Sequence, residues 1–307
     1  MNTAMTQAPG STMSQPTRSR RGSQALRLLQ GYAFFYPAFL LVAAVLFVPL
    51  FHAIWQSVHA ADYMEIGRFV GLANFVNLLM HDGGLRDIGL SIVFVGGSVL
   101  LATPLGVGLA VLLNRPMRWR AFFRTVLVAP WVVSQLVTGL LWLWLYDDRL
   151  GPLQAMMQSL GIRALITDPD WAMASLILTN VWHSYPLVMV FTLAALQTVP
   201  SEVIEAATID GASAWRRFWR ITLPLIRNTL KVAVVLTTLH TFNTVTTILI
   251  MTGGGPAGAT EVLALRVFKE GFQFFRMEVA ATAAVLILLL NIAFSLAFVR
   301  VLKSDHA

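Results

Sequence analysis

The chain has 307 residues and a formal net charge of +7, yet only 12% of its residues are charged and 57% are hydrophobic. Soluble domains have about twice this share of charged residues, so the composition excludes an ordinary soluble protein and indicates a membrane protein. The chain has no cysteine. This excludes disulfides, thiolate chemistry and cysteine metal sites.

The first thirty residues are polar and rich in Ser, Thr, Pro and Gln. Such a segment cannot bury enough apolar surface to fold, so residues 1–30 are expected to form a disordered tail. A single membrane domain is expected to follow over residues 31–303, and residues 304–307 form a short C-terminal tail.

Six apolar stretches occupy the membrane domain, and none contains Asp, Glu, Lys or Arg except at its edges. Each can cross a hydrocarbon core of about 30 Å as a helix, which takes about 20 residues. Because the stretches are continuously apolar rather than alternating, they favour helices over a β-barrel. We therefore expect an all-α integral membrane protein with six transmembrane helices, near residues 33–55, 88–114, 125–146, 172–197, 232–252 and 279–299.

Lysine and arginine are unevenly distributed over the connections between these helices. Fifteen lie in the two tails and the second and fourth connections, against seven in the other three connections. By the positive-inside rule, both termini and the fourth connection are expected to be cytoplasmic. The positive net charge is then a topology signal and requires no nucleic acid.

Several uncharged polar and aromatic residues lie within the expected helices, where contact with lipid would be costly. They either join helices to one another or line a passage for a neutral, hydroxyl-rich solute. The residues expected to line such a pathway are Gln135, Trp182, His183, Tyr185, Asn243, Thr244 and Thr247.

The sequence offers no energy source of its own. The helix cores contain no carboxylate, which argues against proton coupling, although sodium coupling through carbonyls and hydroxyls stays open. None of the three lysines follows a glycine, so a phosphate-binding loop is excluded. The histidines form no HExxH pair, and neither a catalytic constellation nor a cofactor or metal site is expected.

The fourth connection, residues 200–227, contrasts with the apolar stretches around it, and we call it the coupling segment. A helix capped by Ser201 is expected to run to about residue 209, followed by a turn at Asp210-Gly211. A second, amphipathic helix capped by Ser213 is expected to end at Pro224, before the fifth span.

Three functions fit such a helix–turn–helix segment: a helix pair lying on the membrane surface, a DNA-reading motif, or a docking element for a cytoplasmic partner. Tethering close to the bilayer at both ends disfavours DNA reading. Docking is the preferred interpretation.

The segment also resembles a named signature. Glu205-Ala206-Ala207, Gly211, Ile221 and Leu223-Pro224 match the EAA motif of membrane subunits of binding-protein-dependent ABC importers, spacing included. Thr252-Gly253-Gly254-Gly255-Pro256 and Glu261-Val262-Leu263 resemble the carbohydrate branch of that family, which transports sugars or glycerol 3-phosphate.

The resemblance implies a type I ABC importer permease fold, with cytoplasmic coupling helices, in a prokaryotic cytoplasmic (inner) membrane. It implies four kinds of partner: a second and different permease, two ABC ATPase subunits that bind ATP and Mg, an extracytoplasmic solute-binding protein, and a sugar or polyol substrate. This chain would then be no enzyme itself. The alternative is a stand-alone carrier or channel. The residues implied to couple to the ATPase are Glu205, Ala206, Ala207, Asp210, Gly211, Leu223 and Pro224.

Overall fold

The structure is a computed structural model that describes the chain apart from residues 1–19, 63–64, 160, 162–164 and 304–307. The described residues are mostly helical. The chain divides into two units, residues 1–52 and residues 53–307.

The first unit contains most of helix α1 (Arg20–Ser57), which ends within the second unit. Its stretch Phe35–Ser57 is long and apolar enough to cross a membrane. Because α1 begins at Arg20, residues 20–30 of the expected disordered tail are helical. Residues 1–19 and the expected C-terminal tail lie outside the described residues.

The second unit carries the remaining elements, with one small antiparallel hairpin between α1 and α2. In chain order they are β1 (His59–Asp62), β2 (Glu65–Phe69), α2 (Ala73–Met80), α3 (Gly84–Leu113), α4 (Arg120–Val132), α5 (Gln135–Leu145), α6 (Pro152–Gln158), α7 (Pro169–Leu196), α8 (Ser201–Ile209), α9 (Ala214–Arg217), the π-helical turn η1 (Phe218–Thr222), α10 (Leu223–Phe242), α11 (Thr246–Met251), α12 (Leu263–Phe268), a second π-helical turn η2 (Lys269–Gln273) and α13 (Met277–Lys303).

Among the described residues, five helices are long and apolar enough to cross a membrane, and a bent pair of helices can form a sixth span. The third span consists of α4 and α5, which meet at an angle of 98°. The fifth also differs from expectation, because α10 ends at Phe242 and a separate short helix, α11, covers most of the rest. Both differences arise at polar residues, Ser134 and Asn243, within apolar sequence.

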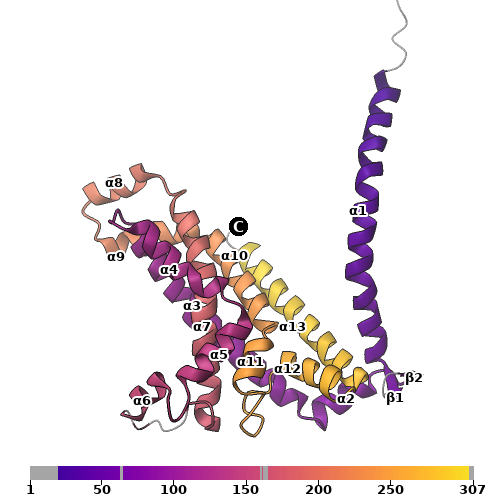
Figure 1. Ribbon diagram of the computed structural model, residues 1–307. Helices are drawn as coiled ribbons and strands as arrows, with labels where there is room; N and C mark the ends of the chain where they lie inside the picture. Colours follow the sequence, from indigo (N-terminus) through magenta and orange to yellow (C-terminus); the bar gives the residue numbers. More distant parts are fainter. Residues whose placement is uncertain (1–19, 63–64, 160, 162–164, 304–307) are drawn as a thin grey trace, which may run out of the picture. The chain divides into compact units, whose positions relative to one another are not determined.

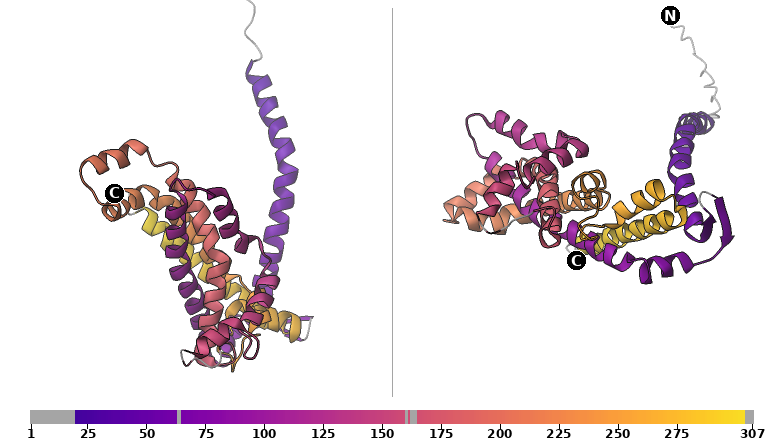
Figure 2. Two further views of the ribbon diagram at one scale, coloured as in Figure 1. Left: turned by 60° about the vertical axis from the view of Figure 1, so that its left-hand side comes forward. Right: turned by 60° about the horizontal axis from the view of Figure 1, so that its bottom comes forward.

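The core of the second unit lies where α3 packs along α7, with α10 beside them (Figures 1 and 2). Gly106 of α3 is the point of closest approach. A Cβ atom there would lie 2.8 Å from the backbone oxygen of Tyr185 and 2.8 Å from Cβ of Val188. Small residues let membrane helices approach to backbone contact, and van der Waals packing then holds them together.

The coupling segment and the C-terminal half of the fifth span lie at opposite ends of the second unit. Figure 1 shows α8 and α9 at one end, and α6, α12 and the start of α3 at the other. The helices between them therefore connect the coupling segment to the opposite end.

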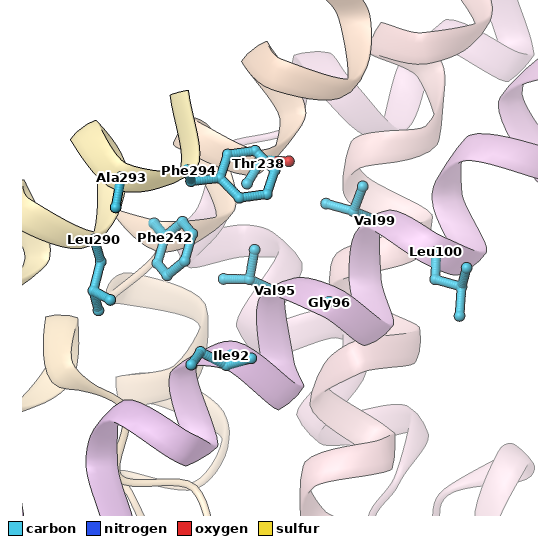
Figure 3. Close-up of a pocket in the computed structure, with 10 residues that line it drawn as sticks. All are labelled: Ile92, Val95, Gly96, Val99, Leu100, Thr238, Phe242, Leu290, Ala293 and Phe294. Carbon is cyan, nitrogen blue, oxygen red and sulfur yellow. The ribbon is translucent and has the colours of Figure 1, made fainter. Parts of the chain in front are cut away.

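An apolar groove of about 470 Å³ opens between α3, α10 and α13 (Figure 3). The groove exists because Gly96 and Ala293 have little or no side chain to fill it. Phe242 and Phe294 form part of its wall. Its one hydroxyl, on Thr238, donates to the carbonyl of Val234 in its own helix at 2.8 Å. The groove therefore offers no unpaired hydrogen-bonding group from its side chains.

Replacing Gly106 tests the helix packing. Because the obstructing atoms belong to the backbone and a branched side chain of α7, Gly106→Ala should force the helices apart and cost about 1–3 kcal/mol. Thermal unfolding of the purified protein should show a lower Tm. The control is Gly89→Ala on the same helix, where no atom lies within 4 Å of the added carbon. An unchanged Tm for Gly106→Ala would contradict the close approach.

Candidate functional site

The coupling segment begins with α8, whose C-terminus is closed by Gly211. The Gly211 amide donates to the carbonyl of Thr208 at 3.1 Å, and the Ala212 amide donates to that of Ala207 at 3.0 Å. This pair of bonds is the Schellman motif, which requires a left-handed residue, and Gly211 has φ +75°. The turn and the end of α8 are confirmed. Ser201 is the first residue of α8 rather than its cap.

The second helix of the segment runs without a break into the membrane. Ser213 caps α9 as predicted, with Oγ accepting from the Arg216 amide at 3.3 Å. The expected break at Pro224 is wrong, because α9, η1 and α10 form one continuous helix. Proline removes a backbone donor and crowds the preceding turn, and the wider π-helical turn before it accommodates both effects.

The segment exposes large apolar side chains. Ile209 is 87% exposed and Trp215 is 72% exposed, on either side of the glycine turn. Glu205, Ala206 and Asp210 are exposed as well. Of the remaining residues expected to couple to the ATPase, Ala207 is buried, Leu223 is half-buried and Pro224 is exposed. An exposed apolar surface of this kind is typical of a protein contact.

A second candidate site lies where the two broken spans meet. The Ser134 hydroxyl caps α5 at the bend between α4 and α5. From α11, the Thr247 hydroxyl donates to the carbonyl of Gln135 at 3.3 Å. The backbones approach closely here, since a Cβ on Gly139 would lie 3.1 Å from Ile250. The beginning of α5 is therefore covered by α11.

Four side chains at this point form a group that we call the polar cluster: Gln135, Thr138, His183 and His240. Gln135 Nε2 lies 3.4 Å from His240 Nε2. The His183 and His240 rings stack with centroids 6.1 Å apart, and Thr138 Oγ1 lies 3.5 Å from His183 Nδ1. His240 remains exposed. The cluster thus presents amide, hydroxyl and imidazole groups to an accessible surface.

The other predicted pathway residues occupy different environments. Tyr185 is buried in the core against α3, and Trp182 packs edge-on against Trp142 at 5.8 Å. Asn243 is exposed, with its amide bonded to the carbonyl of Leu239 at 2.7 Å. Thr244 and Thr247 are buried. The structure therefore brings Gln135 and His183 together, with Thr247 against the backbone of Gln135.

His240 and Thr138 complete the polar cluster but are absent from the predicted set. His240 is separated from Gln135 by 105 positions in the sequence. No local sequence pattern predicts such a pairing, because it depends on the angle at which two broken helices cross. A polar residue within an apolar stretch is the only sequence signal available.

An ionic cluster occupies the opposite end from the coupling segment. Arg266 pairs with Asp87 at 2.9 Å and with Glu270 at 3.2 Å, and Glu270 also binds Arg276 at 2.6 Å. Asp87 and Glu270 are buried. Burial alone would lower the pKa of Arg266, but the neighbouring carboxylates Asp87, Glu270 and Glu261 together outweigh it and raise that pKa. The guanidinium therefore stays charged, and it joins α3 to α12 and η2.

A separate ion pair organises the glycine-rich loop after α11. Lys269 and Glu261 pair at 2.6 Å beside Gly254, whose φ is +91°. A side chain at Gly254 would collide with this pair. The Thr260 hydroxyl donates to the carbonyl of Gly255 at 2.7 Å. The loop is thus closed by side-chain bonds.

The second unit combines long apolar helices, two broken spans around a polar cluster and an exposed helix–turn–helix segment. Together these features define a membrane permease subunit. The chain belongs to the family described as the binding-protein-dependent transport system inner membrane component, whose model matches residues 102–304. It is therefore a multi-pass inner-membrane protein whose relatives are transport permeases.

Individual relatives extend the likeness over most of the chain. The sn-glycerol-3-phosphate transport system permease protein UgpA of Agrobacterium fabrum is 32% identical over 265 residues, which cover 85% of this chain and 90% of that protein. The trehalose/maltose transport system permease protein MalF of Thermococcus litoralis is 29% identical, covering 88% of this chain and 92% of that protein.

A solved structure supports the fold. The chain superposes on a component of a bacterial ABC transporter involved in the import of the acidic polysaccharide alginate with a TM-score of 0.79. Sequence identity is 22%, and the match covers 93% of this chain and 99% of that chain. The permease fold of ABC importers is therefore confirmed.

Removing the central carboxylate of the ionic cluster tests its contribution to stability. Glu270→Ala leaves Arg266 and Arg276 with one partner fewer, and breaking a buried pair costs about 3–5 kcal/mol. The variant should unfold at a lower temperature. Glu65→Ala, which removes an exposed carboxylate from the hairpin, should leave the Tm unchanged. Equal Tm values for the two variants would contradict this role.

Proposed function

We propose that this chain imports a sugar or related polyol as one of two permease subunits in an ATP-driven ABC importer. The observation that carries the proposal is the coupling segment, an exposed helix pair joined without interruption to a membrane helix. Family membership favours this function over a stand-alone carrier or channel.

The remaining subunits follow from the same proposal. A different second permease pairs with this chain, and two ABC ATPase subunits bind ATP and Mg and dock on the coupling segment. A solute-binding protein approaches from outside the cell. A solved alginate transporter contains a periplasmic protein with bound alginate pentasaccharide, and that complex supports the last partner. Both termini and the coupling segment lie in the cytoplasm, as the arginine distribution indicates.

The continuous helix formed by α9, η1 and α10 would convert docking of the ATPase into movement of the membrane helices. When ATP closes the ATPase dimer, α8 and α9 move with the subunit to which they are bound. Because α9 and α10 form one helix, this motion shifts α10 as a rigid body. His240 lies on α10, so the shift displaces it from Gln135 and His183. The pathway then opens to one side or the other.

The polar cluster suits a neutral, hydroxyl-rich solute. Its amide, hydroxyl and imidazole groups donate and accept hydrogen bonds, and the described helix cores around it supply no lysine or arginine to hold a phosphate. Relatives named for trehalose/maltose and for sn-glycerol 3-phosphate both handle polyhydroxylated solutes. Of these two chemistries, we favour the uncharged sugar.

Gly211→Val tests the coupling role. Valine disfavours the left-handed backbone by about 1–2 kcal/mol, so the angle between α8 and α9 changes while insertion is unaffected. The assembled importer should keep its ATPase activity but lose most of its uptake into liposomes, measured with labelled maltose, trehalose and glycerol 3-phosphate.

The matched control is Gly71→Val, which imposes comparable backbone strain (φ +58°) in the connection between β2 and α2. Its uptake should match that of the wild type. Normal uptake by an intact Gly211→Val complex would refute docking at this turn.

Substitutions in the polar cluster test the pathway. Gln135→Leu and His240→Leu remove hydrogen-bonding groups, so each should raise the KM for uptake about 10-fold or more while the complex still assembles. Thr237→Val serves as the control. Its hydroxyl bonds only within α10, to the carbonyl of Ala233 at 2.8 Å, and its uptake should be unchanged. Unaltered KM values for both cluster variants would place the solute elsewhere.

A further inference from the structure

A second apolar groove, distinct from the one in Figure 3, runs along α3 to the coupling segment. It has a volume of about 530 Å³ and is lined on α3 by Leu105, Gly108 and Leu112. Trp215 and Phe218 of the coupling segment close its far end. Leu105 and Leu112 are 42% and 52% exposed, so this wall is open on the second unit.

At its far end the groove meets a more polar cavity of about 590 Å³. The two spaces share four lining residues, Val111, Arg115, Ala214 and Phe218. The polar cavity adds Arg217 and Glu205 to the charged groups. An apolar trough and a charged cavity are therefore continuous through Arg115.

The charges in this cavity leave one cation available. Arg217 donates to the carbonyl of Ala212 at 2.7 Å, which fixes its guanidinium within the glycine turn. Arg115 is exposed and, within the part of the chain that the structure describes, forms no ion pair. Two guanidinium groups face a single carboxylate, so the cavity carries a net positive charge.

We propose that this composite site binds an anionic phospholipid, with its headgroup phosphate at Arg115 and one acyl chain along α3. The trough is apolar and ends in a cationic pocket at the end of a membrane helix. This combination matches an amphiphilic ligand rather than a free anion. Basic pockets between membrane helices bind anionic headgroups in this way. The groove in Figure 3 differs from this site, because it has no charged lining residue that would identify the chemistry of an occupant.

The surrounding residues agree with a position at the membrane surface. Trp215 is 72% exposed and lines the groove, and tryptophan concentrates at the level of the headgroups. A lipid in this site contacts α3 and the coupling segment together. It therefore supports the base of the segment while the exposed apolar side chains Ile209 and Trp219 remain free for a partner. This inference rests on the cytoplasmic placement in the proposed function.

The test measures lipid binding to the assembled complex, independently of uptake or ATP hydrolysis. Native mass spectrometry in detergent follows titration with phosphatidylglycerol and, separately, with phosphatidylcholine. Arg115→Gln removes the available cation, and Gly108→Leu fills the trough. Matched controls are Arg118→Gln in the same connection and Gly89→Leu on the same helix. No atom lies within 4 Å of an added Cβ at Gly108 or Gly89.

Wild-type complex should bind phosphatidylglycerol about five-fold more tightly than phosphatidylcholine, and Arg115→Gln should remove that preference. Gly108→Leu should weaken binding of both lipids, and both controls should behave as the wild type. If Gly108→Leu fails to assemble, the exposed Arg115 position decides the test.

Three outcomes would overturn the proposal. Equal binding of the two lipids to wild type removes the headgroup site, and unchanged binding to Gly108→Leu removes the acyl trough. Binding to the isolated chain that disappears in the complex shows that another subunit covers the surface. None of these outcomes bears on the coupling role, which the uptake of Gly211→Val tests separately.

Discussion

Backbone groups within a bilayer must bond to one another, and this constraint decides where the chain can interrupt its helices. Two spans are interrupted, between Val132 and Gln135 and between Phe242 and Thr246. Both interruptions have protein beside them, because α5 and α11 pack together and Thr247 bonds to the backbone of Gln135. Each interruption therefore has protein packed on one side, while Val132, Ser134 and Asn243 stay exposed. The same arrangement gathers the polar cluster, because it brings Gln135 at the start of α5 and His240 near the end of α10 beside His183 of α7.

The two ends of the second unit differ in how their charged side chains are paired. The end that carries α12 pairs its arginines with buried carboxylates at Asp87 and Glu270, and so holds its loops in fixed positions. At the other end, Arg115 has no such partner among the described residues and remains available. One end is therefore internally neutralised, while the other retains positive charge beside exposed aromatic side chains.

Sequence patterns were sufficient for the approximate limits of every span except the fifth, because a continuous apolar stretch of this length has few alternatives to a membrane helix. They also located the glycine turn and the Ser213 cap, which depend on residues close in sequence. The continuity through Pro224 was missed, since proline ordinarily ends a helix and only the π-helical turn permits it to continue. The pairing of His183 with His240 was missed because it depends on how α7 and α10 pack.

The continuous helix from Ala214 to Phe242 fixes a rotational phase as well as a connection. Each residue of an α-helix advances the side-chain direction by about 100°. Adding or removing one residue between Ser213 and Phe242 would therefore turn the docking face of α9 relative to the polar cluster. The connection before α8 contains no such continuous helix and can change length without this effect. The chain should therefore tolerate a change of length in the connection before α8 and require a constant residue count between Ser213 and Phe242.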